Sequence, residues 1–276
     1  MNFPKDLISC QQLTAIVDHP DLIILDASIA PVAGINAPAQ QWPAYALPNA
    51  KRFDIDKDFS CPSSTLPHTM PSKEQFQQNC QQLGINSNSL IVVYDCFGLF
   101  SSARAWYMFR AMGHTNVAVL DGGLPAWIAE NLATINANSQ PLEPGNFIAQ
   151  PQDSYFCDVE HVLNATKNDN TTIVDARASQ RFLGQVQEPR AGIRSGHIPN
   201  SQNLPYATLL TNSKLKPVNL LKEACTCYED SLIMTCGSGI TACILALAAH
   251  LAGHQDITVY DGSWTEWGAN ASLPIE

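Results

Sequence analysis

The chain is poor in charged residues, and poorest in basic ones. Lys, Arg, Asp and Glu make up 14% of its 276 residues, and 15 basic against 25 acidic side chains give a formal net charge of −10. A protein without a basic surface gains nothing from releasing the counterions of a nucleic acid, and anionic membranes repel it. The composition argues against both kinds of partner and makes each arginine a candidate contact for an anionic ligand.

Long apolar runs, export signals and metal-binding motifs are missing too. No stretch approaches the about 20 apolar residues of a membrane span, and the first residues lack the charged-then-apolar pattern of a signal peptide. Nine cysteines, an odd number without a secretory signal, predict reduced thiols and a cytoplasmic protein. No Cys-x-x-Cys pair occurs, and CTC at 225–227 has the wrong spacing for zinc ligands. We therefore expect no metal site.

The sequence does contain a repeat of itself. Four blocks of the first half recur in the same order in the second, which indicates duplication of a whole domain because solenoid repeats are far shorter. The pairs are LIILDAS (22–28) with TIVDARAS (172–179), ALPNA (46–50) with HIPNS (197–201), LIVVYDCFG (90–98) with SLIMTCGSG (231–239), and VAVLDGGLPAW (117–127) with ITVYDGSWTEW (257–267). We predict domains at residues 1–135 and 155–276, joined by a polar, proline-rich linker at 136–154.

Within each half, short Val, Ile and Leu runs alternate with longer segments that favour helices. LIILDA, SLIVVYD and VAVLDG are typical of buried parallel strands. Segments 102–113 and 239–253 are expected to be helices that end at Gly113 and Gly253. The pattern predicts an α/β fold with a parallel sheet flanked by helices in each half. Sites in such sheets form beyond the carboxyl ends of the strands, where Cys236 falls.

Cys236 ends a strand-like run and is followed by Gly-Ser-Gly and a helix-prone segment. Backbone N–H groups from Gly237 to Thr241 lack helical acceptors and can point at the sulfur, which would lower the pKa of the thiol. Gly237 and Gly239 would let the backbone curl closely around it. A buried structural cysteine is the alternative. Because the equivalent residue of the first half is Asp95, the turn does not need a thiol for packing, and this favours a chemical role.

Other cysteine chemistries require particular neighbours. A phosphatase loop needs an arginine six residues after the cysteine, where this chain has Ala242. A redox Cys-x-x-Cys motif needs its second cysteine where Gly239 stands, and no Lys-Ser or Lys-Thr pair completes a Walker loop. A cysteine protease with a histidine partner stays open, although no flanking signature supports it.

Four stretches resemble those of tandem rhodanese-domain sulfurtransferases. They are CGSGITA (236–242), DARASQRFLGQVQEPRAGIRSGHIPNSQNLP (175–205), VVYDCFGLFSSARAWYMFRAMGH (92–114) and LDGGLPAW (120–127). The resemblance covers nearly the whole chain. It implies two rhodanese-like domains, the first inactive and the second catalytic, with the active site between them. The Cys-Gly-Ser-Gly-x-Thr loop resembles the 3-mercaptopyruvate branch, whereas thiosulfate-preferring members carry basic residues after the cysteine.

The resemblance implies a sulfur relay in two half-reactions and without a cofactor. The Cys236 thiolate would attack the sulfur of 3-mercaptopyruvate, pyruvate would leave, and the persulfide would pass its outer sulfur to an acceptor, which predicts ping-pong kinetics. A small thiol, a thioredoxin-like protein and cyanide are the expected acceptors. Two other functions stay open: a thiosulfate sulfurtransferase, and a persulfide carrier that hands sulfur to a partner protein without turnover.

The resemblance also implies roles for residues around Cys236. Arg181 and Arg190 match positions that bind the carboxylate and carbonyl of a keto-acid donor, and a guanidinium suits a planar carboxylate. Ser238 and Thr241 can donate hydroxyl hydrogen bonds to the sulfur or to the leaving enolate, although Thr241 could instead simply begin the helix. The predicted substrate-binding residues are Arg181, Arg190, Gly237, Gly239, Ile240 and Thr241.

Segment 53–72 resembles a family segment that approaches the catalytic loop. Residue-by-residue comparison gives Asp56 and His68, which would either relay protons with Ser238 or order the loop. Three further residues are expected to have structural roles, and a fourth could have a structural or a functional role. Arg177 is expected in a salt bridge, His197 in anchoring a loop and Cys243 in the core, while Arg194 fits a structural or a functional role.

Overall fold

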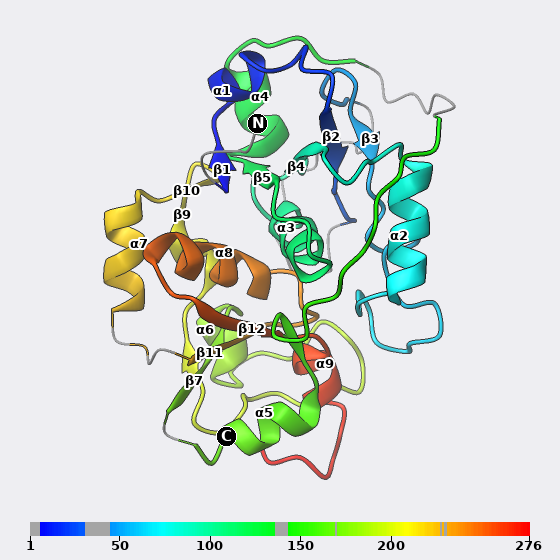
Figure 1. Ribbon diagram of the computed structural model, residues 1–276. Helices are drawn as coiled ribbons and strands as arrows, with labels where there is room; N and C mark the ends of the chain where they lie inside the picture. Colours follow the sequence, from blue (N-terminus) through cyan, green and yellow to red (C-terminus); the bar gives the residue numbers. More distant parts are fainter. Residues whose placement is uncertain (1–5, 31–44, 136–142, 169, 227, 229–230) are drawn as a thin grey trace.

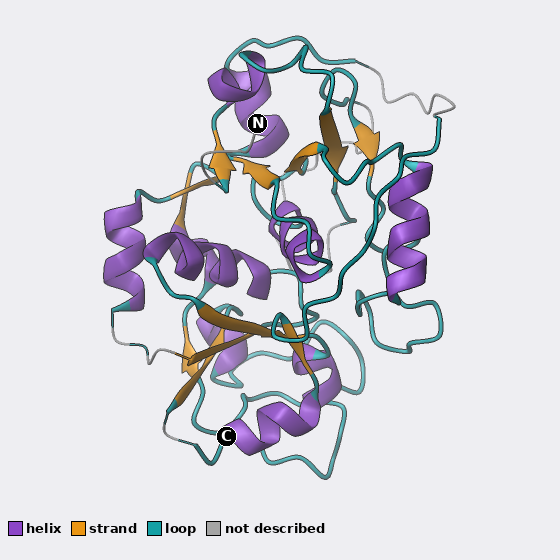
Figure 2. Cartoon of the chain, in the orientation of Figure 1, coloured by secondary structure: helices purple, strands orange, loops and turns teal. Residues whose placement is uncertain are grey.

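The computed structural model describes residues 6–30, 45–135, 143–168, 170–226, 228 and 231–276 (Figures 1 and 2). It contains one parallel five-stranded sheet in each half of the chain, with helices on both sides of each. Cys227 and residues 136–142 of the predicted linker lie outside the described residues.

The first sheet has the strand order β1-β5-β4-β2-β3, and all neighbouring strands are parallel. Its central strand is buried along its whole length, as expected for a parallel sheet covered on both faces. The elements of this half are β1 (Leu7–Ile8), α1 (Cys10–Thr14), β2 (Leu22–Asp26), β3 (Lys51–Arg52), α2 (Lys73–Gln82), β4 (Leu90–Tyr94), α3 (Ser102–Ala111), β5 (Val117–Leu120) and α4 (Gly123–Ala129).

The second sheet repeats the first strand by strand, in the order β6-β12-β11-β7-β8. Its elements are β6 (Phe156–Cys157), α5 (Val159–Ala165), β7 (Thr171–Asp175), α6 (Ser179–Phe182), β8 (Gln202–Asn203), a 3₁₀ helix η1 (Tyr206–Leu209), an antiparallel pair β9 (Leu210–Thr211) and β10 (Lys214–Leu215), α7 (Val218–Cys225), β11 (Ser231–Thr235), α8 (Ala242–Ala252), β12 (Asp256–Tyr260) and α9 (Ser263–Trp267). The repeated topology confirms the predicted α/β fold in both halves.

The predicted helices form, but both are shorter than expected. The segment at 102–113 forms α3, and Gly113 follows its end with φ +82°. The helix predicted at 239–253 ends at Gly253, as expected, but begins only at Ala242. Gly239 has φ +77°, a left-handed conformation that no α-helix accommodates, so residues 239–241 belong to the loop after Cys236.

Residues 143–152, most of the described part (143–154) of the predicted linker, pack along the first half. The backbone N–H groups of Gly145 and Phe147 donate to the carbonyls of Gln81 and Ile85 (2.8 and 3.0 Å). The ring of Phe147 is buried, with 1% of its surface exposed. This segment is therefore fastened to the first half by backbone hydrogen bonds and by a buried ring before it enters β6.

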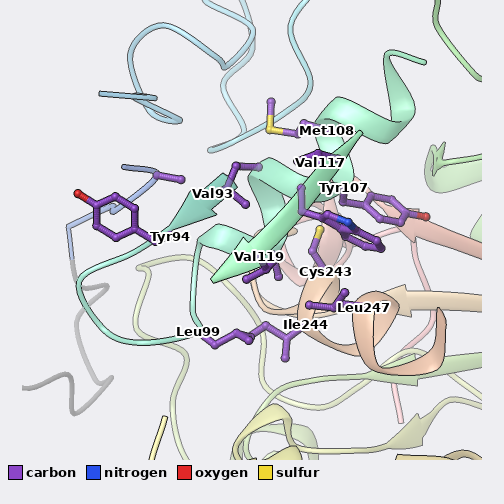
Figure 3. Packing of buried hydrophobic residues seen from close by; sticks show 14 of the residues in the cluster. Val93, Tyr94, Leu99, Tyr107, Met108, Val117, Val119, Cys243, Ile244 and Leu247 are labelled. Atoms are coloured by element: carbon purple, nitrogen blue, oxygen red, sulfur yellow. The ribbon is translucent and has the colours of Figure 1, made fainter. Parts of the chain in front are cut away.

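The two halves share one hydrophobic core. α3 packs against α8 between the two sheets (Figure 1), and Figure 3 shows Cys243, Ile244 and Leu247 of α8 close to Tyr107 of α3 and Val119 of β5. A smaller cluster fills the other face of the second sheet, under α5 and α9. Cys243 is fully buried, which agrees with its expected place in the core. No helix in the described part of the chain has the length and apolar character needed to cross a membrane.

Candidate active site

Cys236 directly follows β11, at the carboxyl end of the central strand of the second sheet. It is 2% exposed and lines a pocket of about 30 Å³. Residues of the second half form most of this pocket, but Ile29 and Phe100 of the first half close one side of it. The remaining lining residues are Arg181, Arg190, Gly237, Ser238, Ile240 and Thr241. Five of the six predicted substrate-binding residues thus line the pocket that contains the sulfur, between the two halves, and only Gly239 does not.

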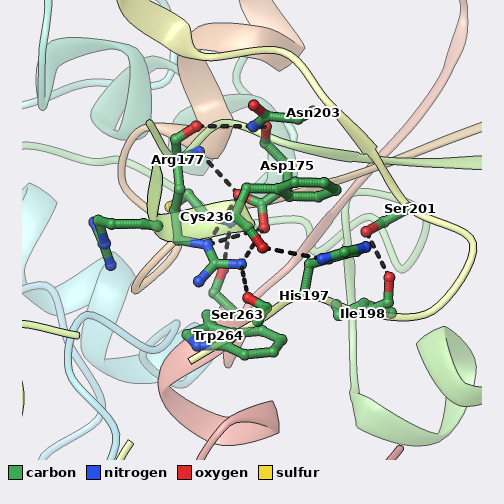
Figure 4. A network of polar contacts seen from close by, with 12 residues as sticks. Asp175, Arg177, His197, Ile198, Ser201, Asn203, Cys236, Ser263 and Trp264 are labelled. Carbon is green, nitrogen blue, oxygen red and sulfur yellow. Dashed lines mark hydrogen bonds and ion pairs between the residues drawn. The ribbon is translucent and has the colours of Figure 1, made fainter. Parts of the chain in front are cut away.

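The start of α9 holds the backbone of the cysteine loop. Cys236 N–H donates to the hydroxyl of Ser263 (3.3 Å), and the Cys236 carbonyl accepts from Trp264 N–H (3.0 Å) (Figure 4). The Gly237 carbonyl accepts from both the N–H and the hydroxyl of Thr265 (2.9 and 2.5 Å). Ser263 and Thr265 were not predicted as site residues, because the sequence repeat around Trp267 does not indicate which polar atoms face the loop.

The two predicted substrate arginines differ in their partners. Arg181 on α6 donates from Nε and Nη2 to the two oxygens of Glu188 (3.1 and 2.5 Å), which is 4% exposed. Arg190 donates to a neutral group, Thr265 Oγ1 (3.4 Å), and forms no salt bridge with a described carboxylate. Burial and the neighbouring charge of Arg181 lower the pKa of the Arg190 guanidinium. Of the two pocket arginines, Arg190 is therefore the one that has no described carboxylate within salt-bridge distance.

Glu188 is a site residue that the sequence analysis missed. It accepts hydrogen bonds from Arg181 and from Nη1 of Arg177 (3.1 Å), so one buried carboxylate lies between two guanidinium groups. Its position in QEPRAG, between Arg181 and Arg190 in the sequence, is the signal that would have identified it as an arginine partner.

Arg177 and His197, which were expected to be structural, have structural contacts. Arg177 pairs with Asp175 (2.7 Å) and lies over the ring of Trp264, 4.3 Å from its centroid. The network in Figure 4 includes this pair and His197, which stacks on Phe182 and reaches its carbonyl through Nδ1 (2.9 Å). Arg194, for which two roles were open, donates to the backbone carbonyls of residues 267, 268, 270 and 273. All three side chains fix loops around the pocket.

His68 and Asp56 reach the cysteine loop from the first half. His68 Nδ1 lies 3.1 Å from Ser238 Oγ and 3.3 Å from the Ser238 carbonyl, and its Nε2 lies 2.9 Å from Asp56 Oδ1. The imidazole is 8% exposed and the aspartate side chain 48%. The hydrogen bond from His68 lowers the pKa of Asp56. The three predicted residues thus form a hydrogen-bonded chain that runs from solvent to the serine beside Cys236.

Thr241 and Gly239 have distinct places in the loop. Thr241 occupies the position just before α8 but makes no capping hydrogen bond with its hydroxyl, so the hydroxyl is not needed to begin the helix. It lines the pocket instead. Gly239 turns away from the pocket and contacts Arg104 of the first half, which is described below. It has a left-handed backbone and is not among the residues that line the pocket.

The equivalent loop of the first half is filled by its own aspartate. The carboxylate of Asp95 accepts the N–H groups of Phe97, Phe100, Ser101 and Ser102 at 2.8–3.1 Å, and the Ser102 hydroxyl at 2.6 Å. Asp95 is fully buried. This loop therefore curls its amides around an anion without a Gly-Ser-Gly sequence, and the anion is part of the chain.

The described residues include no group of three or more His, Cys, Asp or Glu side chains arranged to hold a metal ion. The cysteines among them are free thiols: Cys10, Cys61, Cys80, Cys96, Cys157, Cys225, Cys236 and Cys243. Cys243, the nearest in sequence to Cys236, is fully buried, and burial raises its pKa to about 12. At neutral pH Cys243 is a thiol within the core and not a second nucleophile.

The chain is similar to known proteins in both sequence and structure. The rhodanese-like domain family matches residues 9–130 and 158–270. The 3-mercaptopyruvate sulfurtransferase of Rattus norvegicus is 38% identical over 277 residues, 95% of this chain and 92% of that protein. The thiosulfate sulfurtransferase of the same organism is 38% identical over 261 residues, 90% of this chain and 85% of that protein. The crystal structure of SseA from Escherichia coli, a 3-mercaptopyruvate sulfotransferase, superposes with a TM-score of 0.83 at 32% identity and covers 94% of this chain and 99% of its own.

Proposed function

Because the chain belongs to the family of rhodanese-like domains, we propose that it is an enzyme that transfers sulfur from 3-mercaptopyruvate to a thiol acceptor through a persulfide on Cys236. The observation that carries the proposal is the pocket itself. A nearly buried cysteine lies beside two arginines and a neutral Gly237-Ser238 turn, which suits a donor with one carboxylate. The rat 3-mercaptopyruvate and thiosulfate sulfurtransferases are both 38% identical to this chain, so the donor assignment rests on the chemistry of the loop.

The first half-reaction forms the persulfide. The Cys236 thiolate attacks the thiol sulfur of 3-mercaptopyruvate, an S–S bond forms, and the C–S bond breaks with its electron pair going to the enolate of pyruvate. The enolate takes up a proton at carbon and leaves as pyruvate, while the outer sulfur, as a persulfide, loses one. Arg181 and Arg190 line the pocket and supply positive charge for the donor carboxylate and for the enolate that develops during the step.

Arg190 binds the donor carboxylate, and the guanidinium of Arg181, held by Glu188, lies beside the cysteine loop. The division follows from their partners, since Glu188 already occupies two nitrogens of Arg181 and Arg190 has only the hydroxyl of Thr265. A carboxylate that enters the pocket gains most from the cation whose charge is not yet matched. Thr241 and Ile240 line the same pocket and complete the proposed substrate contacts.

Ser238, His68 and Asp56 relay the proton of the first half-reaction. Ser238 Oγ is within hydrogen-bond distance of His68, and His68 in turn contacts Asp56, which is the arrangement needed to move a proton between the pocket and solvent. The half-exposed Asp56 forms the solvent end of this chain. The alternative role of His68 and Asp56 is to order segment 53–72. A proton relay and an ordering role predict different values of kcat when His68 is replaced.

The second half-reaction returns the thiolate. A thiolate acceptor attacks the outer sulfur, its new S–S bond replaces the one to Cys236, and a hydropersulfide leaves; cyanide gives thiocyanate in the same way. The proposed acceptor is a small thiol or a cysteine at the tip of a thioredoxin-like protein, which would reach the persulfide through the pocket that Cys236 lines. A cytoplasmic site of action suits an enzyme with this many free thiols, because a reducing compartment keeps them unpaired. The proposal also divides the chain into a non-catalytic domain at residues 1–135, a linker at 136–154 and a catalytic domain at 155–276.

A comparison of donors tests the proposed function. The protein is incubated with 3-mercaptopyruvate or thiosulfate, its intact mass is measured, and pyruvate release is followed with excess small thiol. We expect one added sulfur per chain and sustained turnover with 3-mercaptopyruvate, and poor turnover with thiosulfate. Equal use of thiosulfate would overturn the donor assignment. One equivalent of pyruvate without further turnover would identify a persulfide carrier instead of an enzyme.

A further inference from the structure

Arg104 belongs to α3 of the first half, but its guanidinium lies among residues of the active site. The side chain is fully buried, with 0% of its surface exposed. It donates from Nη1 to the Gly239 carbonyl (3.3 Å) and from Nη2 to the His68 carbonyl (2.6 Å) and Asp261 Oδ1 (2.7 Å). It also lies over the ring of Phe156, 4.5 Å from the centroid. A buried guanidinium needs such partners because removing it from water is costly.

Two of these partners have left-handed backbones at the centre of the proposed chemistry. Gly239 follows Ser238 and has φ +77°, and His68 has φ +62°. A non-glycine residue in this region is strained and persists only where its surroundings fix it. The His68 carbonyl is fixed by Arg104 while its imidazole contacts Ser238. One side chain therefore holds the backbone on both sides of the contact between His68 and Ser238.

The contact with Gly239 also orients the cysteine loop. In a trans peptide the carbonyl and the following N–H point in opposite directions. Because the Gly239 carbonyl points at Arg104, the N–H of Ile240 points away from it, and Ile240 lines the pocket. A Cβ atom added to Gly239 would lie 3.1 Å from Arg104 Nη1, so the glycine and the arginine are packed against each other.

Asp261 completes the arrangement from the end of β12. Its Oδ1 pairs with Arg104, and its Oδ2 accepts the N–H of Met70 (2.8 Å), two residues after His68. The ion pair between Arg104 and Asp261 thus joins three segments that are far apart in the sequence: α3, the loop of His68 and Met70, and the second sheet.

We propose that Arg104 is a positioning residue of the sulfur-transfer reaction, which acts by holding His68 and the Gly239 turn in register with Cys236. The first half thereby contributes to catalysis through a residue that never touches the substrate. The inference rests on the proposed function, and it assigns to α3 a role beyond packing on α8. Loss of Arg104 should slow the chemical step while leaving donor binding by Arg181 and Arg190 largely intact.

The test compares Arg104→Gln and Arg104→Lys with Arg110→Gln. Arg110 lies on the same helix, pairs with Asp6 (2.9 Å) and does not line the catalytic pocket. We expect Arg104→Gln to lower kcat at least about tenfold per persulfide-forming site and to change KM for 3-mercaptopyruvate by less than about threefold. Arg104→Lys should recover part of kcat because it keeps the charge, and Arg110→Gln should keep wild-type kcat. Counting active sites by intact mass removes the effect of a smaller folded fraction.

A double-mutant cycle separates positioning from general stabilisation. In a His68→Gln background, Arg104→Gln should cost less in kcat than it does in the wild type, since part of its effect passes through the imidazole. Additive effects, or wild-type kcat in folded Arg104→Gln, would overturn the inference. If Arg104→Gln does not fold, Asp261→Asn carries the test: it keeps the shape and an oxygen for Met70 N–H but removes the charge, and an unchanged kcat would overturn the inference equally. If the wild-type protein gains no sulfur from 3-mercaptopyruvate, the proposed function itself is refuted.

Discussion

His68 of the first half and Ser238 of the second lie 3.1 Å apart, measured from Nδ1 to Oγ. This contact joins segments 170 positions apart in the sequence, directly beside the cysteine at the end of β11. In the proposed mechanism the second half carries the nucleophile Cys236, and the first half supplies His68 and Asp56, which face the cysteine loop.

That contact makes a kinetic prediction for His68. If His68 relays protons with Ser238, then His68→Gln and Ser238→Ala should each lower kcat about 10²-fold or more, the usual range for a general acid or base, and change KM for 3-mercaptopyruvate little. Steady-state kinetics check this, with His161→Gln on the exposed face of α5 as the control. A wild-type kcat in folded His68→Gln would leave loop ordering as the role of this residue.

Cys236→Ser should abolish turnover in a folded protein, because a hydroxyl cannot form a persulfide. Intact mass after treatment with 3-mercaptopyruvate should show one added sulfur on the wild type and none on the variant. Cys61→Ser is the matched control, because Cys61 is a more exposed thiol on the loop that carries His68. A sulfur adduct that survives in Cys236→Ser would assign the nucleophile to another cysteine.

Arg190→Ala should lower kcat/KM for 3-mercaptopyruvate without lowering the stability of the protein, whereas Arg181→Ala should lower both. Loss of a hydrogen bond to a charged group costs about 1.5–3 kcal/mol, which corresponds to roughly tenfold to a hundredfold in kcat/KM. Arg181→Ala should show a comparable loss and also lower the free energy of unfolding, because it leaves one side of the buried Glu188 without its partner. Urea unfolding and donor kinetics of both variants distinguish these effects. Normal donor efficiency in Arg190→Ala would place the carboxylate elsewhere.

The neutral Gly237-Ser238 pair should set the donor preference. Thiosulfate brings two negative charges to the sulfur, so Gly237→Arg with Ser238→Lys should raise the ratio of thiosulfate to mercaptopyruvate efficiency at least about tenfold, some 1.4 kcal/mol in relative barrier. The effect should weaken with ionic strength, because salt screens the added attraction. Measuring kcat/KM for both donors at two salt concentrations checks this.

Two structural features define the control for that variant. A side chain at position 237 would meet Arg181, whose Nη2 lies 3.3 Å from the place that a Cβ atom would take there, and Ser238 contacts His68. Absolute rates with 3-mercaptopyruvate should therefore fall in any double substitution. Gly237→Gln with Ser238→Gln matches the added bulk without charge, and its donor ratio should stay near that of the wild type. Equal ratios in the charged and neutral variants would show that pocket shape, not charge, selects the donor.

Asp95→Ala should destabilise the first half. The substitution removes the acceptor of four buried N–H groups and a hydroxyl, so we expect the free energy of unfolding to fall by at least about 3 kcal/mol. Urea unfolding measures this loss, and Asp18→Ala at an exposed turn should stay within about 0.5 kcal/mol of the wild type. Equal stability of the two variants would mean that the loop does not depend on its buried anion.

The sequence by itself was sufficient for the repeat, the α/β fold and the position of Cys236. These features depend on local patterns: buried strands are continuous apolar runs, Gly253 ends a helix with a left-handed turn, and a duplicated domain repeats its motifs in order. The pocket residues within 236–241 follow for the same reason, because neighbours in a loop stay neighbours in the fold. The start of α8 was misplaced by three residues, since the glycine that permits the cysteine loop also delays the helix.

Only the tertiary structure decided which groups meet across the halves and how charges are matched. Arg104 reaches Gly239, 135 positions away, and Glu188 takes up two nitrogens of Arg181, while Arg190 forms no salt bridge with a described carboxylate. Such contacts depend on how α3 packs on α8 and on which side chain the fold leaves without a counter-charge. No local period in the sequence encodes these distances, because they are set by the packing of surfaces that the chain brings together only when both halves have folded.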